Sequence, residues 1–319
     1  MENKGKKRVL FIGIPDMAYV GLDRLLAAGV NIVGVVGPKK THEMYTPFKT
    51  FVLSRGLNLI EYDSLKDEKF INTLKSLDLD IAVVCSFNYK IPKVMLDIPK
   101  DGILNTHPSL LPAYRGGNPY SWVIINGEKQ SGVTIHFMDE EFDTGDIVAQ
   151  QVVPIAENAT MGTVFNELNL IGADMMVAVL NYYEKQKLPR VSQSQITQSG
   201  LNFPIAPNIE GQSLLLNFEK PAVELERFIR AVNPFLIATS VFRDNVVRVF
   251  SADVVVDSNA KKYPAGSIVK IEEDRFFIAT KENFLVPTTL QFGSFFIGSS
   301  KDFINIVKPK VGECFQWKN

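Results

Sequence analysis

The amino-acid sequence predicts an α/β protein with a mostly parallel β-sheet, followed by a smaller β domain. Over the first two-thirds of the chain, short β-rich runs alternate with stretches of helical periodicity, which is typical of strands joined by crossover helices. From about residue 202 onward, the chain changes to one helical stretch and several short β-rich runs. The sequence therefore predicts a first domain over residues 1–190, a linker over 191–203 and a second domain over 204–319.

The predicted strands of the first domain are short and almost entirely apolar. Such runs fit strands that are covered by helices on both faces better than strands with one face in water. The predicted strands cover residues 9–14, 31–37, 57–62, 80–87, 132–138 and 147–155. The predicted helices cover residues 19–28, 48–55, 67–76 and 161–185.

The second domain is predicted to be a small antiparallel barrel or sandwich. A helix is expected over residues 222–232, because the spacing of its apolar residues suits one packed face. Short β-rich runs follow, separated by turn residues, at 238–242, 246–256, 266–271, 275–279 and 284–287. The aromatic side chains here are expected to pack in a core or an interface rather than to stack on bases; they include Phe276, Phe277, Phe292, Phe295 and Phe296.

Composition and charge favour a soluble, cytoplasmic protein. Hydrophobic residues make up 46% of the chain, and no stretch approaches the roughly 18 uninterrupted apolar residues of a membrane helix. The net charge of −1 gives no overall electrostatic argument for binding nucleic acid. Cys85 and Cys314 match no metal-ligand spacing, and Cys85 lies in an apolar run where a buried thiol is expected. No metal site is predicted.

The densest polar information lies at the end of one extended segment and in a loop between two predicted strands. Asn105 and His107 are two residues apart, so their side chains point to the same side of an extended chain. A carboxamide beside an imidazole suits a tetrahedral oxyanion, because both groups can donate hydrogen bonds to it. Asp143, in a glycine-containing loop, would hold the imidazole in its charged form and help to accept a proton from an attacking amine.

The other histidines offer weaker alternatives. A single asparagine or histidine at a strand end is more often a structural group than a catalyst, but the neighbouring Asn105 and the following Pro- and Gly-rich loop favour His107. His136 alternates with Thr134 on a predicted strand, which favours a packed position or one at the edge of a substrate site. His42 lies in a polar loop without a companion.

Two ordered motifs make the chain resemble the folate-dependent formyltransferase family. The run Asn-Thr-His-Pro-Ser-Leu-Leu-Pro at residues 105–112, with Tyr-Arg-Gly at 114–116, is similar to the first signature of the family. The run Gly-Val-Thr-Ile-His at 132–136, with Asp-Thr-Gly-Asp at 143–146, is similar to its second signature. Residues 225–235 resemble the helix that opens the small C-terminal barrel of the methionyl-tRNA and sugar formyltransferases. The resemblance implies a Rossmann-like first domain and an OB-like second domain, and it argues against the purine-synthesis branch, which lacks the barrel.

The resemblance also implies an enzyme that transfers a formyl group from 10-formyltetrahydrofolate to a primary amine. Asn105 and a protonated His107 would stabilise the oxyanion, and Asp143 would orient His107 and relay the amine proton. The donor would lie against two segments, which comprise Phe87, Asn88, Tyr89, Lys90 and Ile91 in one and Asp139, Glu140 and Glu141 in the other. Ordinary core packing remains the alternative for the apolar members of the first segment.

The acceptor amine is less strongly indicated than the donor. Residues 86–92 and 118–128 are similar to the sugar-modifying branch, and the loop at 37–49 is shorter than the basic insertion with which the tRNA-modifying branch approaches tRNA. Residues 13–18 resemble instead the first loop of methionyl-tRNA formyltransferase. The sequence therefore predicts a nucleotide-linked amino sugar or similar small molecule as the acceptor. Methionyl-tRNA is the alternative, and a non-catalytic folate- or nucleotide-binding module is a lesser one.

Substrate contacts are expected from the first loop and from the segment that follows the first signature. The residues expected to make them are Gly13, Ile14, Pro15, Arg115, Gly116 and Tyr120. Lys39, Lys40 and Lys49 offer phosphate contacts, although a solvated charge cluster is the simpler account. No membrane partner is predicted, and the oligomeric state stays open.

Overall fold

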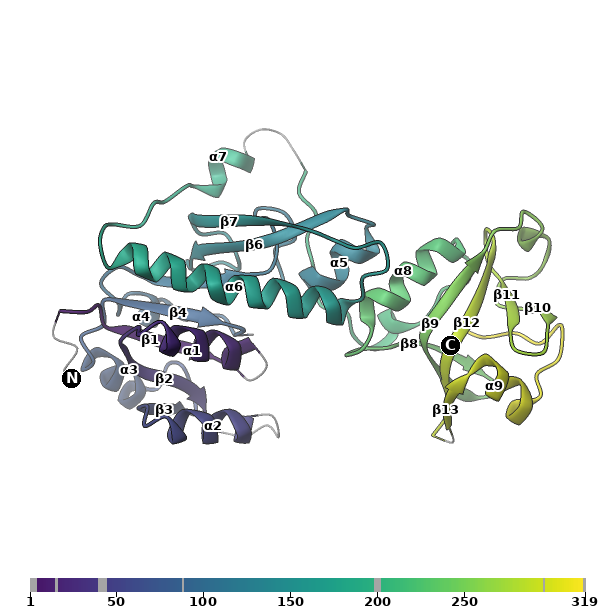
Figure 1. The fold of residues 1–319 in the computed structure, drawn as a ribbon, viewed down its shortest axis with the longest axis horizontal. Helices are drawn as coiled ribbons and strands as arrows, with labels where there is room; N and C mark the ends of the chain where they lie inside the picture. Colours follow the sequence, from purple (N-terminus) through teal and green to yellow (C-terminus); the bar gives the residue numbers. More distant parts are fainter. Residues whose placement is uncertain are drawn as a thin grey trace. The chain divides into compact units, whose positions relative to one another are not determined.

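The computed structural model describes residues 5–14, 17–39, 45–87, 89–197, 202–294 and 296–317 of the 319-residue chain. The chain forms two compact units, which are drawn with their elements in Figure 1. The first unit comprises residues 1–119, 130–154 and 166–207, and the second comprises residues 120–129, 155–165 and 208–319. This grouping divides the chain into more segments than the domain boundaries expected from the sequence, which stay a prediction.

A seven-stranded sheet forms the centre of the first unit, in the order β3-β2-β1-β4-β5-β6-β7. Its strands are β1 (Val9–Gly13), β2 (Ile32–Pro38), β3 (Leu59–Tyr62), β4 (Ile81–Cys85), β5 (Ile103–His107), β6 (Gln130–Phe137) and β7 (Ile147–Pro154). The first five strands pair in parallel, whereas β6 runs antiparallel to both β5 and β7. This confirms the mostly parallel sheet. The strand order reverses between β1 and β4, so the switch point of the sheet lies at the ends of those strands.

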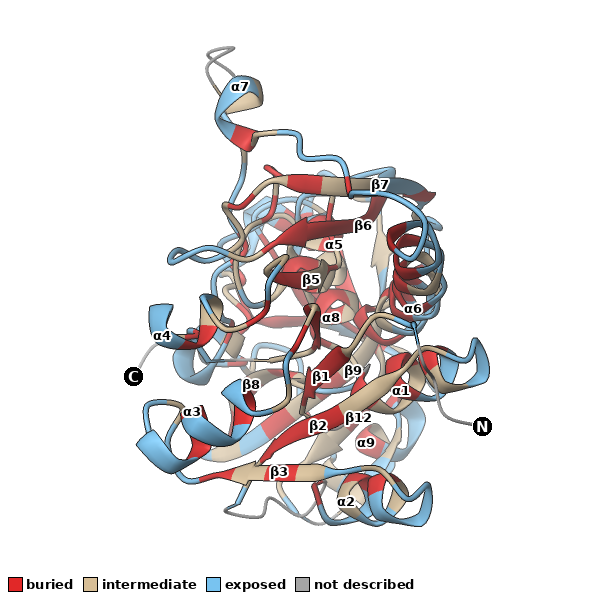
Figure 2. Cartoon of the chain, turned by 90° about the vertical axis from the view of Figure 1, so that its left-hand side faces the viewer, coloured by how far each residue is buried: buried red, intermediate tan, exposed pale blue. Residues whose placement is uncertain are grey.

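Alternate side chains of the parallel strands face two helical layers. The helices of this unit are α1 (Met17–Ala27), α2 (Tyr45–Ser54), α3 (Glu68–Lys75), α4 (Lys93–Leu96), most of α6 (Met161–Tyr183) and α7 (Gln193–Thr197). Val9 and Phe11 share one apolar cluster with α1, α2 and α6, whereas Leu10 and Ile12 face the cluster that includes α3 and α4. Figure 2 shows β1 and β2 as largely buried strands beside helices with exposed outer surfaces. Burial on both faces explains why these strands read as continuous apolar runs.

The long helix α6 is a core helix of the first unit. Its length and apolar composition would also suit a membrane span, the one such helix among the residues described. Met176, Val179 and Leu180 are buried in the cluster that α6 shares with α1 and α2. The apolar character of α6 is therefore explained by packing against the sheet.

Within the described residues, four helices lie where the sequence predicted none. They are α4, α5 (Pro119–Ile125), α7 and α9 (Ser300–Val307). Each contains four to eight residues, which is about two turns at most and too short for a clear periodic signal. Helix α7 occupies part of the segment 191–203, which the sequence predicted as a polar linker.

The second unit is an antiparallel sheet that closes into a barrel. The strand order is β10-β11-β12-β9-β8, with β13 paired to β12. The C-terminal segment bonds to both edges, because Ile268 of β10 donates to the carbonyl of Glu313 (2.8 Å) and Gln316 donates to the carbonyl of Val241 of β8 (2.7 Å). These bonds join the two edge strands and confirm the predicted barrel. Its elements are η1 (Gly211–Leu214), α8 (Ala222–Val232), β8 (Ala238–Phe242), β9 (Asn245–Val255), η2 (Ala260–Lys262), β10 (Ile268–Ile271), β11 (Phe276–Ala279), β12 (Phe284–Phe292), β13 (Phe296–Ser299) and α9.

Strand β12 is longer than the sequence predicted. The expected strand ended at Pro287, a residue that cannot donate a ladder hydrogen bond. In the structure the strand continues to Phe292, and its pairing with β9 shifts register between Pro287 and Thr289. The irregularity accommodates the proline, and the extension provides the partner of β13.

Aromatic rings fill the barrel. The ring of Phe276 stacks on Phe303 at 5.1 Å between centroids, and Phe242 lies 4.8 Å from Phe315. Phe277 is buried in a neighbouring cluster, and Phe292 and Phe296 pack against the main one. These positions confirm core packing for the described members of the predicted aromatic set; Phe295 lies outside the described residues.

The C-terminal segment, which joins the two edge strands, gives a test of the barrel. Phe315 is 2% exposed, and we expect Phe315→Ala to lower the free energy of unfolding of the second unit by about 3–5 kcal/mol, because the cavity cannot be filled. Tryptophan fluorescence during guanidinium denaturation reports on this unit alone, since the two tryptophans, Trp122 and Trp317, both belong to it. The exposed Val311→Ala is the control, and equal unfolding midpoints for the two variants would contradict the role of the C-terminal segment.

Candidate active site

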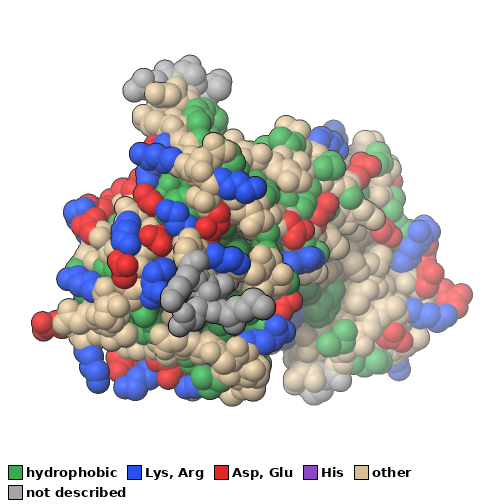
Figure 3. Space-filling view, turned by 60° about the vertical axis from the view of Figure 1, so that its left-hand side comes forward, with side chains coloured by type: hydrophobic (Ala, Val, Ile, Leu, Met, Phe, Trp, Pro, Cys, Tyr) green, Lys and Arg blue, Asp and Glu red, His purple; other side chains and the backbone are tan. Residues whose placement is uncertain are grey.

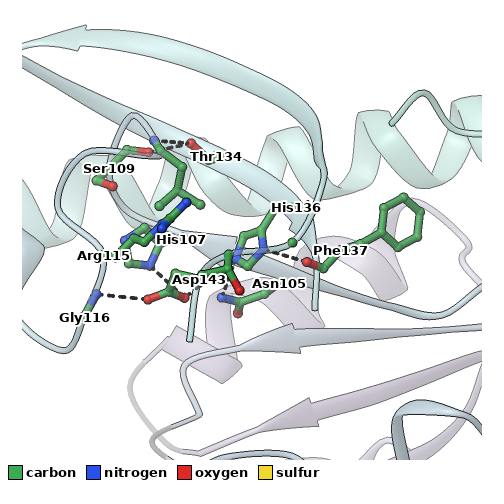
Figure 4. Close-up of polar contacts among 12 residues, drawn as sticks. Asn105, His107, Ser109, Arg115, Gly116, Thr134, His136, Phe137 and Asp143 are labelled. Carbon is green, nitrogen blue, oxygen red and sulfur yellow. Dashed lines mark hydrogen bonds and ion pairs between the residues drawn. The ribbon is translucent and has the colours of Figure 1, made fainter. Parts of the chain in front are cut away.

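The side chains at the end of β5 meet partners on β6. The antiparallel register pairs Asn105 with His136 and His107 with Thr134. Asp143 comes from the loop between β6 and β7, and Figure 4 shows its carboxylate beside the two histidine rings. The structure thus brings together the three side chains predicted to be catalytic and adds His136 to them.

His136 is a buried and neutral partner of Asn105. Its Nδ1 donates to the carbonyl oxygen of Phe137 (2.8 Å), because a carbonyl can only accept. Burial and the nearby charge of His107 lower the pKa of His136 to about 4, so Nε2 carries a lone pair at neutral pH. Nε2 therefore accepts from the Asn105 amide (3.1 Å), which sets the direction of the Asn105 carboxamide. The packed position expected for His136 is confirmed.

His107 has one ring nitrogen engaged and one directed at Asp143. Its side chain is almost fully buried, and Nε2 donates to the carbonyl oxygen of Tyr114 (2.9 Å). Nδ1 lies 3.5 Å from Asp143 Oδ1. Nδ1 is therefore the ring nitrogen that is directed at Asp143, which is a constraint that the sequence did not reveal.

Asp143 is held in a sterically restricted conformation. Its φ of +58° lies in the left-handed region, where residues other than glycine are uncommon. The backbone N–H of Gly116 donates to Asp143 Oδ2 (3.0 Å). A side chain at Gly145 would place its Cβ 2.0 Å from the carbonyl oxygen of Phe137, so the loop needs glycine there. The loop therefore presents the Asp143 carboxylate in one orientation.

A buried network fixes the loop that follows β5. The hydroxyl of Thr134 donates to the carbonyl of Ser109 (2.6 Å) and accepts from the N–H of Leu111 (3.1 Å). The Gln150 amide donates to the carbonyl of Leu111 (2.8 Å) and to the Thr134 hydroxyl (2.9 Å). The peptide bond between Leu111 and Pro112 is cis. The chain leaves β5 along a path that side chains of β6 and β7 determine.

Some features that shape the site were not predicted from the sequence. The contact of His136 with Asn105 could have been found by pairing the two strands, because the two residues lie opposite each other. Gln193 and Gln150 gave no signal, since an isolated glutamine in a polar segment or a strand has no distinguishing pattern. Gln193 Oε1 accepts from Arg115 Nε (3.2 Å) and Nη2 (2.6 Å), so it holds the guanidinium predicted to contact substrate.

The two segments predicted to hold the donor lie side by side. Lys90 Nζ is 3.3 Å from Glu141 Oε1, and Glu140 lies 3.7 Å from Lys93 Nζ. In the first segment, the rings of Phe87 and Tyr89 are 5.6 Å apart, Tyr89 is exposed and Ile91 is buried in the core. In the second, the Asp139 carboxylate accepts from the N–H of Glu141 and from the Thr144 hydroxyl. Asn88 lies outside the described residues.

The residues predicted to contact substrate fall into three places. Ile14 follows Gly13 at the end of β1, and its N–H donates to the carbonyl of Ser86 (2.9 Å), which joins the ends of β1 and β4. Arg115 and Gly116 lie in the loop next to Asp143. Tyr120 belongs to the second unit, where its ring lies 5.1 Å from Phe165. Pro15 lies outside the described residues.

The cysteine that the sequence singled out is buried, and two of the lysines form ion pairs. Cys85 is buried, and burial raises the pKa of its thiol to about 12, which confirms the expectation of an unreactive thiol. Lys39 pairs with Asp63 (2.9 Å) and Lys49 with Glu61 (2.7 Å). Basic and acidic side chains are interspersed on the face shown in Figure 3. Lys40 and His42 lie outside the described residues.

The pKa of His136 is directly measurable because the chain contains three histidines. We expect the ring resonance that is missing in His136→Gln to titrate near pH 4, well below the model-peptide value near 6.5, in NMR of histidine-labelled protein. The unfolded chain binds this proton between pH 6.5 and 4 and the folded chain does not, so stability falls as the pH drops through that window. A titration midpoint above about 7 would show that His136 is mostly charged at neutral pH, where Nε2 could not accept from Asn105.

Comparisons with known proteins point to one family. Residues 25–180 match the family described as Formyl transferase, and residues 208–308 match Formyl transferase, C-terminal domain. The chain is 34% identical to a methionyl-tRNA formyltransferase of Azobacteroides pseudotrichonymphae over 291 residues, which is 88% of this chain and 90% of that relative. It is 33% identical to the methionyl-tRNA formyltransferase of Clostridioides difficile, over 89% of this chain and 92% of the relative.

A solved structure with the same fold is the N-formyltransferase from Helicobacter canadensis in complex with folinic acid and dTDP-3-aminofucose. It matches with a TM-score of 0.62 and 18% identity, over 88% of this chain and 98% of that one. At this identity the likeness concerns the fold alone. The family matches and the relatives along nearly the whole chain show that this protein belongs to the folate-dependent formyl transferase family, whose enzymes use formyltetrahydrofolate as the one-carbon donor.

Proposed function

We propose that this enzyme transfers the formyl group of 10-formyltetrahydrofolate to a primary amine at the site formed by Asn105, His107 and Asp143. The observation that carries the proposal is the convergence of a carboxamide, an imidazole and a carboxylate. His107 Nδ1 lies 3.5 Å from Asp143 Oδ1, and Asn105 is oriented by His136. Acyl transfer between two nitrogen atoms requires donors for an oxyanion and a group that accepts the amine proton, and this set contains both.

In the proposed reaction, the acceptor nitrogen forms a bond to the formyl carbon while the carbonyl oxygen gains negative charge. Asn105 and protonated His107 donate hydrogen bonds to that oxygen. The amine loses one proton towards Asp143, the bond from the formyl carbon to N10 of the folate breaks, and N10 takes up a proton. Because Nε2 of His107 is bonded to the Tyr114 carbonyl, Nδ1 would serve both Asp143 and the reacting oxygen, and a proton would have a short path between them.

We place the donor between the segments 87–91 and 139–141. The ion pair between Lys90 and Glu141 joins these segments. The burial of Ile91 anchors the first segment in the core, and the Asp139 carboxylate organises the second. The described residues of both segments are thus tied to their surroundings, which suits recognition of a flat pterin through backbone hydrogen bonds.

For the acceptor, we propose a nucleotide-linked amino sugar or a similar small amine. The sequence of residues 118–128 supports this choice, and so does the pairing of Lys39 and Lys49 with acidic side chains, which leaves fewer free cations for an RNA backbone. Methionyl-tRNA is the second candidate, because relatives 33–34% identical to this chain carry that name. We expect the enzyme to act in the cytoplasm in either case.

The catalytic set is tested by Asp143→Asn and His107→Ala. We expect each variant to lower the rate of formyl transfer by about 100-fold or more, because general acid–base and oxyanion groups contribute factors of this size. Asp146→Asn is a matched control in the same loop, since Asp146 pairs with Arg190 at 3.8 Å. Binding of the stable analogue 5-formyltetrahydrofolate verifies that each variant is folded. Full activity of Asp143→Asn would refute the proposed mechanism.

The acceptor is tested by parallel assays with 10-formyltetrahydrofolate as donor. One assay follows formylmethionine on charged initiator tRNA, and the other follows formylation of dTDP-linked amino sugars by mass spectrometry. We expect faster turnover of an amino sugar. Fast turnover of methionyl-tRNA that is lost in His107→Ala would establish the second candidate instead. Folate binding without turnover of any amine would favour a non-catalytic binding module.

A further inference from the structure

Gln193 is a buried side chain without a role in the reaction described above. It begins helix α7, and its side chain is 1% exposed although the surrounding segment is polar. A buried carboxamide is costly unless its donors and acceptor are all satisfied. The partners of Gln193 therefore indicate why the chain keeps an amide at this position.

The Gln193 amide joins two loops of the site. Its Nε2 donates to the backbone carbonyls of Asp143 (3.0 Å) and Gly145 (2.8 Å). Its Oε1 accepts from Nε and Nη2 of Arg115. Two donors and one shared acceptor are satisfied at once, and no carboxylate or hydroxyl side chain could make this set of bonds.

These contacts hold Asp143 from two sides. The Asp143 carbonyl is bonded to Gln193, and the Asp143 carboxylate accepts from the N–H of Gly116. Arg115, which Gln193 also binds, directly precedes Gly116 in the chain. The side chain therefore ties the loop that carries the carboxylate to the loop that aims it. Such a tie also compensates for the left-handed backbone of Asp143.

The chain after α7 reinforces the same loop. Three backbone hydrogen bonds join the two segments. The N–H of Tyr114 donates to the carbonyl of Pro204 (2.6 Å), and the N–H of Ala206 donates to the carbonyl of Arg115 (2.8 Å). The N–H of Asn118 donates to the carbonyl of Ala206 (3.1 Å). A Cβ at Gly116 would lie 2.6 Å from the Ala206 oxygen. The described parts of 191–207, expected largely as a linker, therefore pack as part of the first unit.

We propose that Gln193 is a positioning residue for formyl transfer, which sets the place of the Asp143 carboxylate relative to His107 through its bonds to the Asp143 and Gly145 carbonyls. The inference rests on the proposed function, because it takes Asp143 as the proton-accepting group. Gln193 contacts no reacting atom. Its effect is expected in the rate of the chemical step more than in the binding of either substrate.

Three variants separate this role from a general loss of structure. Gln193→Met keeps the length of the side chain and removes all of its hydrogen bonds. Gln193→Glu keeps an acceptor for Arg115 and removes the donors to Asp143 and Gly145. Gln195→Met is the matched control, because Gln195 is exposed on the same helix. Each is assayed for kcat and KM with 10-formyltetrahydrofolate and either initiator methionyl-tRNA or a dTDP-linked amino sugar, whichever the wild type formylates.

We expect Gln193→Met and Gln193→Glu to lower kcat by about 10- to 100-fold, while KM for both substrates stays within about threefold. Gln195→Met should match the wild type. Hydrogen–deuterium exchange should rise in peptides that cover residues 139–146 in both Gln193 variants and stay unchanged in the control. Wild-type kcat in Gln193→Met, or a loss confined to KM, would overturn the inference. Wild-type kcat in Gln193→Glu would assign the effect to Arg115 and overturn it as well.

A double-mutant cycle with Asp143→Asn tests whether Gln193 acts through Asp143. In the Asp143→Asn background, measured under single-turnover conditions, we expect Gln193→Met to change the rate by less than about threefold. A full additive loss would show that Gln193 acts elsewhere. Wild-type activity of the single variant Asp143→Asn would refute both the proposed function and this inference. If Asp143→Asn is impaired and Gln193→Met is fully active, only this inference is refuted.

Discussion

Because β6 runs antiparallel to β5, Asn105 and His107 at the end of β5 each lie opposite a polar residue of β6. Asn105 lies opposite His136, and His107 lies opposite Thr134, whose hydroxyl bonds to the loop that follows β5. A shift of the register by one residue would turn every side chain of one strand to the other face of the sheet. The orientation of the Asn105 carboxamide and the path of the loop after β5 both depend on this pairing.

The crowding of ionisable groups at this register favours the neutral form of His136. His107 and His136 both approach Asp143 Oδ1, at 3.5 Å and 3.7 Å. One carboxylate can balance one imidazolium, and a second positive charge in a buried site would meet both a desolvation cost and repulsion from the first. Burial and the charge of His107 accordingly keep the pKa of His136 low. One histidine is left neutral as an acceptor for Asn105, and the other faces the carboxylate through Nδ1.

The segment between α6 and the barrel connects these local features to the rest of the chain. Gln193 bonds to the loop of Asp143, and residues 204–206 bond to the loop that contains Arg115 and Gly116. Described residues on both sides of 198–201 thus contact the two loops of the site. These residues pack against the first unit, although the composition of the segment is that of a polar linker.

The sequence by itself determined the alternation of strands and helices, the antiparallel second unit and the grouping of Asn105, His107 and Asp143. These features follow from local patterns: continuous apolar runs, two-residue spacing and ordered motifs. Only the tertiary structure decided that His136 orients Asn105, that Nδ1 rather than Nε2 of His107 faces Asp143, and that Gln193 bonds to the loop of Asp143. Each of these depends on contacts between segments far apart in the chain, such as Gln193 and Asp143, which are 50 positions apart. A hydrogen bond of that kind leaves no periodic trace in the sequence, because one residue of the right type at one place is enough to form it.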